Sequence, residues 1–375
     1  MSRRAGLTGF AASRKGRFSK LITQTLPRLL VSVLPVLIFL VALIFLDSYK
    51  LVRFRSVLLT VVLGFAAGFV CILINRSLLD VLGLERGAYA RYVAPPVEEL
   101  VKATYIAYLI WSRRVGFMVD AAICGFAVGA GFAILENVQL MGSLPDSNIF
   151  LWVVRGFGTA VMHGGATALF GTIAKTLHDK YFAEGDRRGG TGQGLGGQFA
   201  AGALSFLPGL AIAVVIHSLY NHFLVSPELS AIGIVIGLPA LMVLVFQQSE
   251  RVLQNWLGVG FDAESELYEM LTSGRTTETH VGQYLMSLKT RFPAGVVADM
   301  LCLLQVHLEL SIRAKGMLLM RESGYEAPAD PDIQEKFAEL KYLEKSVGQT
   351  GRLTIMPFLR WSSRDLWQLY MLGKK

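Results

Sequence analysis

Several ionisable side chains interrupt the apolar segments of this sequence, and they are its best candidates for chemistry. They are Glu98, Glu99, Lys102, Glu136, Arg155, His163 and His217. A charge at membrane depth costs roughly 2.5 to 3.5 kcal/mol on insertion scales, so chains that retain such residues usually use them. Carboxylates transfer protons, and histidines transfer protons or bind metal ions. The set therefore predicts acid–base or metal chemistry inside a membrane.

The first motif, EELVK, follows Pro95 and Pro96 in the segment 95–111. Proline followed by acidic residues is an ordinary helix start. However, a helix ending at residue 111 would be only about 24 Å long, so we expect the motif to lie within the edge of the membrane. Glu98 and Lys102 are four residues apart, so Lys102 can hold one carboxylate ionised beside a less solvated neighbour. Two adjacent carboxylates in different environments are a candidate base and acid.

Each later apolar segment carries its own polar motif. The motifs are Phe132 with Glu136, then Arg155, Thr159 and His163 at intervals of four, and finally His217 with Asn221. Taken singly, a glutamate that reaches toward the membrane surface or a buried histidine is unexceptional. With strict alternation of helix direction, however, the motifs all lie toward one side of the membrane, with His163 somewhat deeper. This agreement favours a single shared site.

The apolar runs themselves predict an all-α fold, a polytopic transmembrane helix bundle of about seven spans. Of the 375 residues, 53% are hydrophobic. We place the spans at 29–46, 56–75, 95–111, 118–141, 149–173, 199–224 and 229–247. The first two carry no charge and approach the ~20 residues that a span needs. The chain is therefore expected to be a multi-pass protein of the cell membrane.

The charge distribution divides the chain into three parts. Residues 1–28 form a basic N-terminal tail with seven Lys or Arg and no acidic residue, and residues 29–249 form the transmembrane domain. Residues 250–375 carry 15 basic and 16 acidic side chains and several helix-start signals. We interpret this last part as a soluble helical domain whose role the sequence does not reveal.

The basic loops give a predicted orientation. Lys and Arg concentrate in loops 48–55, 112–116 and 174–198 and are absent from 142–148 and 225–228. The positive-inside rule then places the three basic loops and the C-terminal domain in the cytoplasm, and the site toward the opposite side. The basic N-terminal tail disagrees, unless the first segment, which contains Pro35, re-enters the membrane without crossing it.

The ordered motifs resemble the PrsW family of intramembrane proteases, which is related to the CAAX prenyl endopeptidase and bacteriocin-processing superfamily. The resemblance spans roughly residues 90–225 and rests on Glu98-Glu99-x-x-Lys102, Phe132-x-x-x-Glu136, His163 and His217-x-x-x-Asn221. It implies a transmembrane protease domain that hydrolyses a peptide bond in or next to the membrane. The implied partner is a membrane-anchored protein substrate, as in site-1 cleavage of an anti-sigma factor.

The resemblance also implies residue roles. Glu98 would be the general base, Glu99 would orient the water or shuttle the proton, His163 and His217 would hold the water or polarise the carbonyl, and Asn221 would donate to the oxyanion. Lys102 and Arg155 are supporting residues. Glu136 stands where the prenyl-endopeptidase branch has histidine, which supports the PrsW branch.

Metal dependence is left open by these residues. His163, His217 and Glu136 could hold a divalent metal such as zinc. The lysine beside the glutamate pair instead favours a metal-independent mechanism in which a glutamate activates the water.

Two other classes of membrane protein also contain charged residues inside the membrane. A proton-coupled transporter or channel is one alternative, and a catalytically silent membrane binding protein is another. Against transport, the motifs do not recur in two halves. Nucleic acid is not an expected partner: the glycine-rich 192–197 follows no predicted strand, and attraction to the lipid bilayer explains the basic tail.

Overall fold

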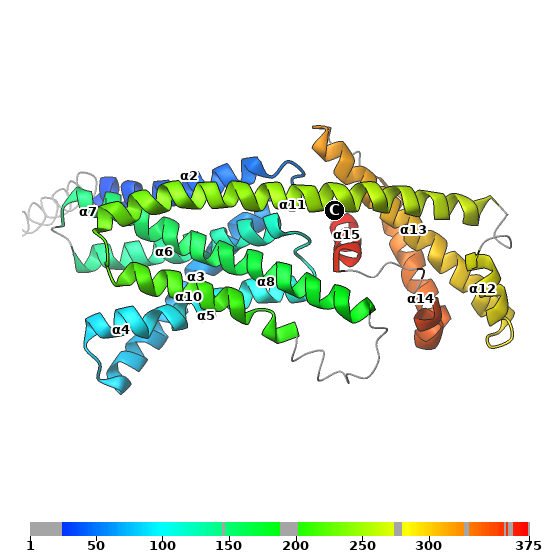
Figure 1. The fold of residues 1–375 in the computed structure, drawn as a ribbon, viewed down its shortest axis with the longest axis horizontal. Coiled ribbons are helices and arrows are strands. Elements are labelled where there is room, and N and C mark those ends of the chain that lie inside the picture. The colour runs from blue at the N-terminus through cyan, green and yellow to red at the C-terminus, as the bar shows by residue number, and fades with distance from the viewer. Residues whose placement is uncertain are drawn as a thin grey trace, which may run out of the picture.

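In the computed structural model, every regular element of the described residues is a helix (Figure 1). The structure describes residues 25–144, 147–187, 202–273, 280–325, 330–355, 358 and 363–373. The predicted basic tail lies outside these ranges apart from its last four residues, and so does the glycine-rich segment 192–197. A polytopic helical bundle, as predicted, is confirmed.

The bundle consists of long helices that alternate in direction, with three short elements between them. In chain order they are α2 (Leu26–Leu46), α3 (Phe54–Leu82), α4 (Arg86–Tyr92), α5 (Ala94–Trp111), α6 (Met118–Ser143), α7 (Ile149–Val154), the π-helix η2 (Arg155–Ala160), α8 (Val161–Arg187), α10 (Leu207–Asn221) and the first half of α11 (Pro227–Thr272). The predicted span 149–173 is thus divided among α7, η2 and α8.

Helix α6 is the centre of the bundle, and 83% of its most apolar stretch is buried. Its small residues explain this position, because they let neighbouring backbones come close. A Cβ atom added at Gly129 would lie 2.3 Å from the carbonyl oxygen of His163 in α8. On the other side, a Cβ atom at Gly64 of α3 would lie 2.1 Å from the carbonyl oxygen of Val128. Close packing thus brings α3 and α8 against the helix that carries Glu136.

This packing makes a testable prediction. The Gly129→Ala variant should lose about 1 to 3 kcal/mol of unfolding free energy, because the added methyl group must push α8 away at His163. Gly233→Ala is the matched control in α11, where an added Cβ atom meets nothing within 4 Å. Denaturation in detergent measures both variants, and equal stability of the two would contradict this account of the α6–α8 contact.

The candidate spans differ in part from the predicted seven. Six described helices are long and apolar enough to cross a membrane: Leu26–Leu46, Phe54–Leu82, Met118–Ser143, Gly202–Asn221, Pro227–Thr272 and Ala294–Glu322. The predicted spans 95–111 and 149–173 are not among them. The first has 18 helical residues that include Glu98, Glu99 and Lys102, and the second is interrupted by η2. The chain is a multi-pass membrane protein.

The C-terminal part forms a helical unit with its own apolar core. It comprises the second half of α11 with α12 (His280–Leu288), α13 (Ala294–Glu322), α14 (Ile333–Ile355) and α15 (Ser363–Gly373). Helix α11 runs for 46 residues without a break. At 1.5 Å per residue it is about 69 Å long, more than twice the thickness of a bilayer core. Its residue range also crosses the predicted domain boundary at 249/250. The domain boundaries stay predictions.

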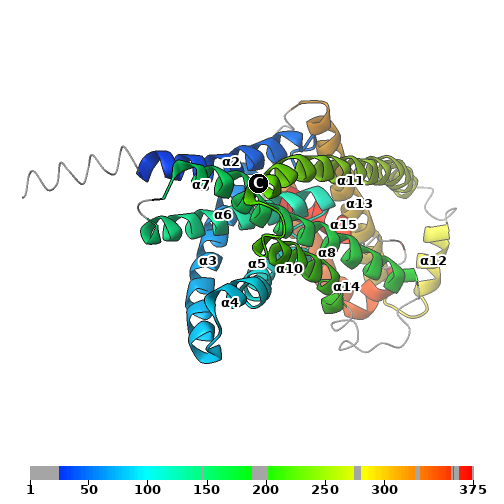
Figure 2. The ribbon, with the colours of Figure 1, turned by 60° about the vertical axis from the view of Figure 1, so that its left-hand side comes forward.

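The two ends of the bundle differ in what they carry (Figures 1 and 2). The loops between α2 and α3 and between α5 and α6 lie at the end that meets the C-terminal unit, where Tyr49 and Phe117 join its core. The glutamate motif opens α5 at the opposite end, beside α4 and the end of α10. Helix α2 is continuous through Pro35, so the described residues do not show the re-entrant start considered above.

Candidate active site

Helix α5 presents its two glutamates to different surroundings. Glu99 and Lys102 are 1% and 0% exposed, and their side chains form an ion pair of 2.5 Å. Glu98 retains 15% of its side-chain surface. The sequence analysis paired Lys102 with Glu98 across one helical turn, and the structure corrects this. Lys102 and Glu99 both point into the bundle, whereas Glu98 points toward α3. Glu98 is therefore the more exposed glutamate of the two.

The buried Glu99–Lys102 pair holds the two predicted histidines. His217 Nδ1 lies 2.8 Å from Glu99 Oε1, and His163 Nδ1 lies 3.1 Å from Lys102 Nζ. The two imidazole rings meet edge to face, with centroids 4.6 Å apart. With both Nδ1 atoms engaged, the Nε2 atoms face the other two carboxylates: His163 Nε2 is 2.9 Å from Glu136, and His217 Nε2 is 3.8 Å from Glu98.

Glu136 is fixed by an arginine from the π-helical turn. Arg155 Nη2 donates to Glu136 Oε1 at 2.9 Å, and Arg155 Nε donates to Asn137 Oδ1 at 2.9 Å. The amide of Asn137 in turn donates to the backbone carbonyl of Ser32 in α2. Arg155 and His163, two members of the predicted polar stripe, thus meet at Glu136. The third member of that stripe, Thr159, contacts the Tyr220 hydroxyl instead, at 3.2 Å.

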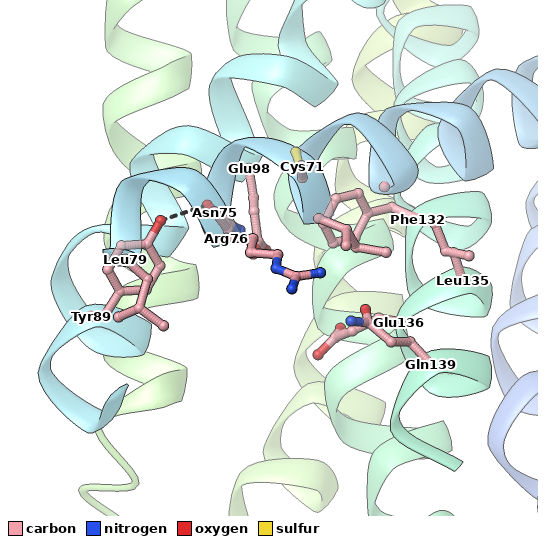
Figure 3. A pocket seen from close by; sticks show the side chains of 12 residues that line it. Cys71, Asn75, Arg76, Leu79, Tyr89, Glu98, Phe132, Leu135, Glu136 and Gln139 are labelled. Carbon is pink, nitrogen blue, oxygen red and sulfur yellow. Dashed lines mark hydrogen bonds between the residues drawn. The ribbon is translucent and has the colours of Figure 1, made fainter. Parts of the chain in front are cut away.

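A cavity of about 360 Å³ opens beside Glu98 (Figure 3). Its walls come from α3, α4, α5 and α6, and they combine apolar residues with the carboxylates of Glu98 and Glu136. Figure 3 shows Arg76 of α3 pointing into the same cavity. The cavity therefore combines an apolar wall with acid–base groups.

One predicted site residue lies apart from this cluster. The amide of Asn221 donates to the backbone carbonyl of Ala90 at 2.9 Å, so it fastens α10 to α4. The neighbouring His222 packs edge to face on Tyr92. Asn221 is the last residue of α10. The remaining candidates, Glu98, Glu99, Lys102, Glu136, Arg155, His163 and His217, are brought together.

Sequence reasoning missed Asn75 and Asn137, which hydrogen-bond to Glu98 and Arg155. It also missed Tyr89, which hydrogen-bonds to Asn75. Asn75 and Asn137 are polar residues within candidate spans, which is the same signal that identified the glutamates. Tyr89 gave no signal, because a tyrosine near a helix end is common at membrane interfaces.

Three side chains are arranged to hold a metal ion. Donor atoms of Glu98, His163 and His217 lie within 4.8 Å of one another. Two histidines and one carboxylate are a familiar donor set of catalytic zinc sites, and such histidines are usually held through their second ring nitrogen. Glu99 holds His217 in this way through Nδ1, whereas both ring nitrogens of His163 are engaged, by Lys102 and by Glu136. The donor set is that of a divalent cation site with Glu98 in place of the predicted Glu136, and a bound cation would replace one of the two His163 contacts.

Comparison with known proteins agrees with this geometry. The model of the PrsW family, described as intramembrane metalloproteases, matches residues 53–247, which is more than half of the chain and extends from α3 into α11. No curated protein and no solved structure matches. The family's description supports a metal without specifying which one. Because the family match covers all of the clustered residues, the chain belongs to the PrsW family and is an intramembrane protease.

Proposed function

We propose that the chain is an endopeptidase that cleaves a membrane-anchored protein substrate, with Glu98 as the acceptor of the proton from the attacking water. The observation that carries this proposal is the position of Glu98. Its carboxylate lines the cavity, while the neighbouring Glu99 is buried and paired with Lys102. Only the first of the two can reach a water molecule and a peptide in the cavity.

The surrounding residues support proton transfer. Glu98 lies 3.8 Å from His217 Nε2, and Glu99 fixes the His217 ring from its other nitrogen. A proton taken up by Glu98 can therefore pass to the leaving amine without movement of the helices. Glu136, held by Arg155 and His163, places a second carboxylate on the cavity wall.

A divalent metal is a second use of the same cluster, with His163 and His217 as its nitrogen ligands and Glu98 as a third donor instead of the base. When bound, such a metal polarises the scissile carbonyl and makes water a stronger nucleophile at neutral pH. Glu99 would then fix the ring of His217 through Nδ1, and Glu136 would hold the ring of His163 through Nε2.

Metal content gives a direct prediction. Purified wild-type protein is expected to contain about one divalent metal ion per chain, and His217→Ala should lose most of it, because loss of one ligand removes a large part of the binding free energy. Elemental analysis measures this, with His280→Ala in the C-terminal unit as the control. A metal-free wild type with full activity would instead favour the metal-independent glutamate mechanism.

The substrate is proposed to be a single-span protein such as an anti-sigma factor, cut next to the membrane. The position of Glu98 in the first turns of α5, at one end of the bundle, supports a cut near the membrane boundary. The test compares new protein N-termini in host membranes that carry either the wild type or Glu98→Gln at equal abundance. Fragments absent only with the variant identify substrate and cleavage site, whereas identical sets would refute the proposal.

A further inference from the structure

We propose that Asn75 is a positioning residue for Glu98 and that Tyr89 holds Asn75 in the required orientation. This inference rests on the proposed role of Glu98 as the reacting carboxylate. It concerns a polar chain that runs from α4 through α3 to α5, three helices that form one side of the cavity. Neither Asn75 nor Tyr89 belongs to the motifs that the sequence analysis identified.

The chain consists of two hydrogen bonds of equal length. Asn75 Nδ2 donates to Glu98 Oε1 at 2.9 Å. Tyr89 Oη donates to Asn75 Oδ1 at 2.9 Å, the dashed line in Figure 3. The orientation of the Asn75 amide follows from chemistry. An ionised carboxylate only accepts hydrogen bonds, so the amide must turn its NH₂ group toward Glu98 and its oxygen toward the Tyr89 hydroxyl.

Asn75 supplies the hydrogen bond that fixes the Glu98 carboxylate. Among the described residues, Glu98 has no ion pair closer than the 3.8 Å contact of its Oε2 with His217 Nε2, and its one hydrogen bond is that from Asn75. A partly exposed glutamate with several rotatable bonds would otherwise sample several rotamers. Because Asn75 binds Oε1, the second oxygen, Oε2, faces His217 and is left for the proton of the water.

Tyr89 is itself held in place from behind. It is 5% exposed, in a short helix that α10 fastens by two side-chain contacts to backbone carbonyls: Ser218 Oγ donates to Arg91, and Asn221 Nδ2 donates to Ala90. Helix α10 is also the helix that carries His217. One rigid connection therefore sets the positions of both His217 and Glu98, which is what precise alignment of reacting groups requires.

The test uses Asn75→Ala, Tyr89→Phe and the double variant. The assay is cleavage of a membrane-anchored reporter that carries the site found by the comparison of N-termini. Asn75→Ala should reduce kcat by about 10- to 100-fold, the effect of losing a hydrogen bond to a charged group, with KM nearly unchanged. Tyr89→Phe, which removes one oxygen atom and keeps the ring, should reduce kcat by about tenfold. The double variant should match Asn75→Ala, because both changes break the same chain.

The control is Tyr92→Phe in the same helix α4, which also removes one hydroxyl oxygen, but from a tyrosine that is 64% exposed and takes no part in the polar chain from Tyr89 to Glu98. It should keep wild-type kcat. If Asn75→Ala does not fold, the comparison of Tyr89→Phe with Tyr92→Phe still tests the positioning role. An active wild type with Tyr89→Phe equal to the control, or with additive effects in the double variant, would overturn the positioning role. A wild type that cleaves nothing would instead refute the proposed function.

Discussion

The Glu98→Gln variant is expected to lose about a thousandfold or more of the cleavage rate while folding normally. Glutamine keeps the shape of the side chain and an oxygen that can accept the hydrogen bond from Asn75, but it cannot accept the proton of the attacking water. Loss of a general base costs about 10²- to 10⁴-fold in typical enzymes. The measurement is the initial rate of reporter cleavage in proteoliposomes, at matched enzyme abundance.

The matched control for this prediction is Glu228→Gln. Glu228 lies in the first turn of α11 and touches none of the clustered side chains described above, so its variant should retain wild-type activity. The metal content of Glu98→Gln adds a second readout. Retained metal with lost activity supports a base, whereas loss of both indicates that Glu98 is primarily a ligand. Full activity of Glu98→Gln would exclude both roles.

The Lys102→Met variant is expected to lose about 3 kcal/mol of unfolding free energy. Lys102 is fully buried, and its ammonium group contacts both Glu99 and His163. Its removal leaves the carboxylate of Glu99 buried without a cation, and breaking a buried pair in this way costs about 3 to 5 kcal/mol. Denaturation in detergent, followed by circular dichroism, measures the loss.

The double variant Lys102→Met with Glu99→Gln isolates the cause. It should regain part of the lost stability, because no unpaired charge is left in the bundle. The control is Lys336→Met in α14, where the lysine side chain is 29% exposed and pairs with Glu309. Such a partly exposed pair contributes no more than about 1 kcal/mol. A Lys102→Met variant as stable as the wild type would show that the pair is not ionised in the folded protein.

The sequence predicted most of the residues that cluster in the structure, since charges in apolar segments are costly and therefore informative. Glu98, Glu99, Lys102, Glu136 and His163 were predicted from this signal and lie together in the structure. The common depth of the motifs followed from alternation of helix direction alone. The all-α bundle likewise followed from the apolar runs, because only helices satisfy their backbone hydrogen bonds within one membrane segment.

The spacing of residues along the sequence did not predict which side chains pair with one another in the cluster. Lys102 could reach either Glu98 or Glu99 along its helix, and it pairs with Glu99 because His163 of α8 lies on that side. Asn221 shares a helical face with His217 at a spacing of four, yet its amide meets the carbonyl of Ala90. Local spacing fixes which residues share a face, but it does not fix what lies opposite that face.

What the sequence by itself determined is therefore the class of the protein and the identity of its charged residues, because both depend on local hydrophobicity and on the cost of burying charge. Only the tertiary structure decided how these residues are paired. The approach of α3 and α8 to α6 at small residues such as Gly64 and Gly129 sets which side chains meet. It also brings Asn75, from a segment without charge, to Glu98. Such contacts depend on the distances between helices, which arise from packing over the whole bundle.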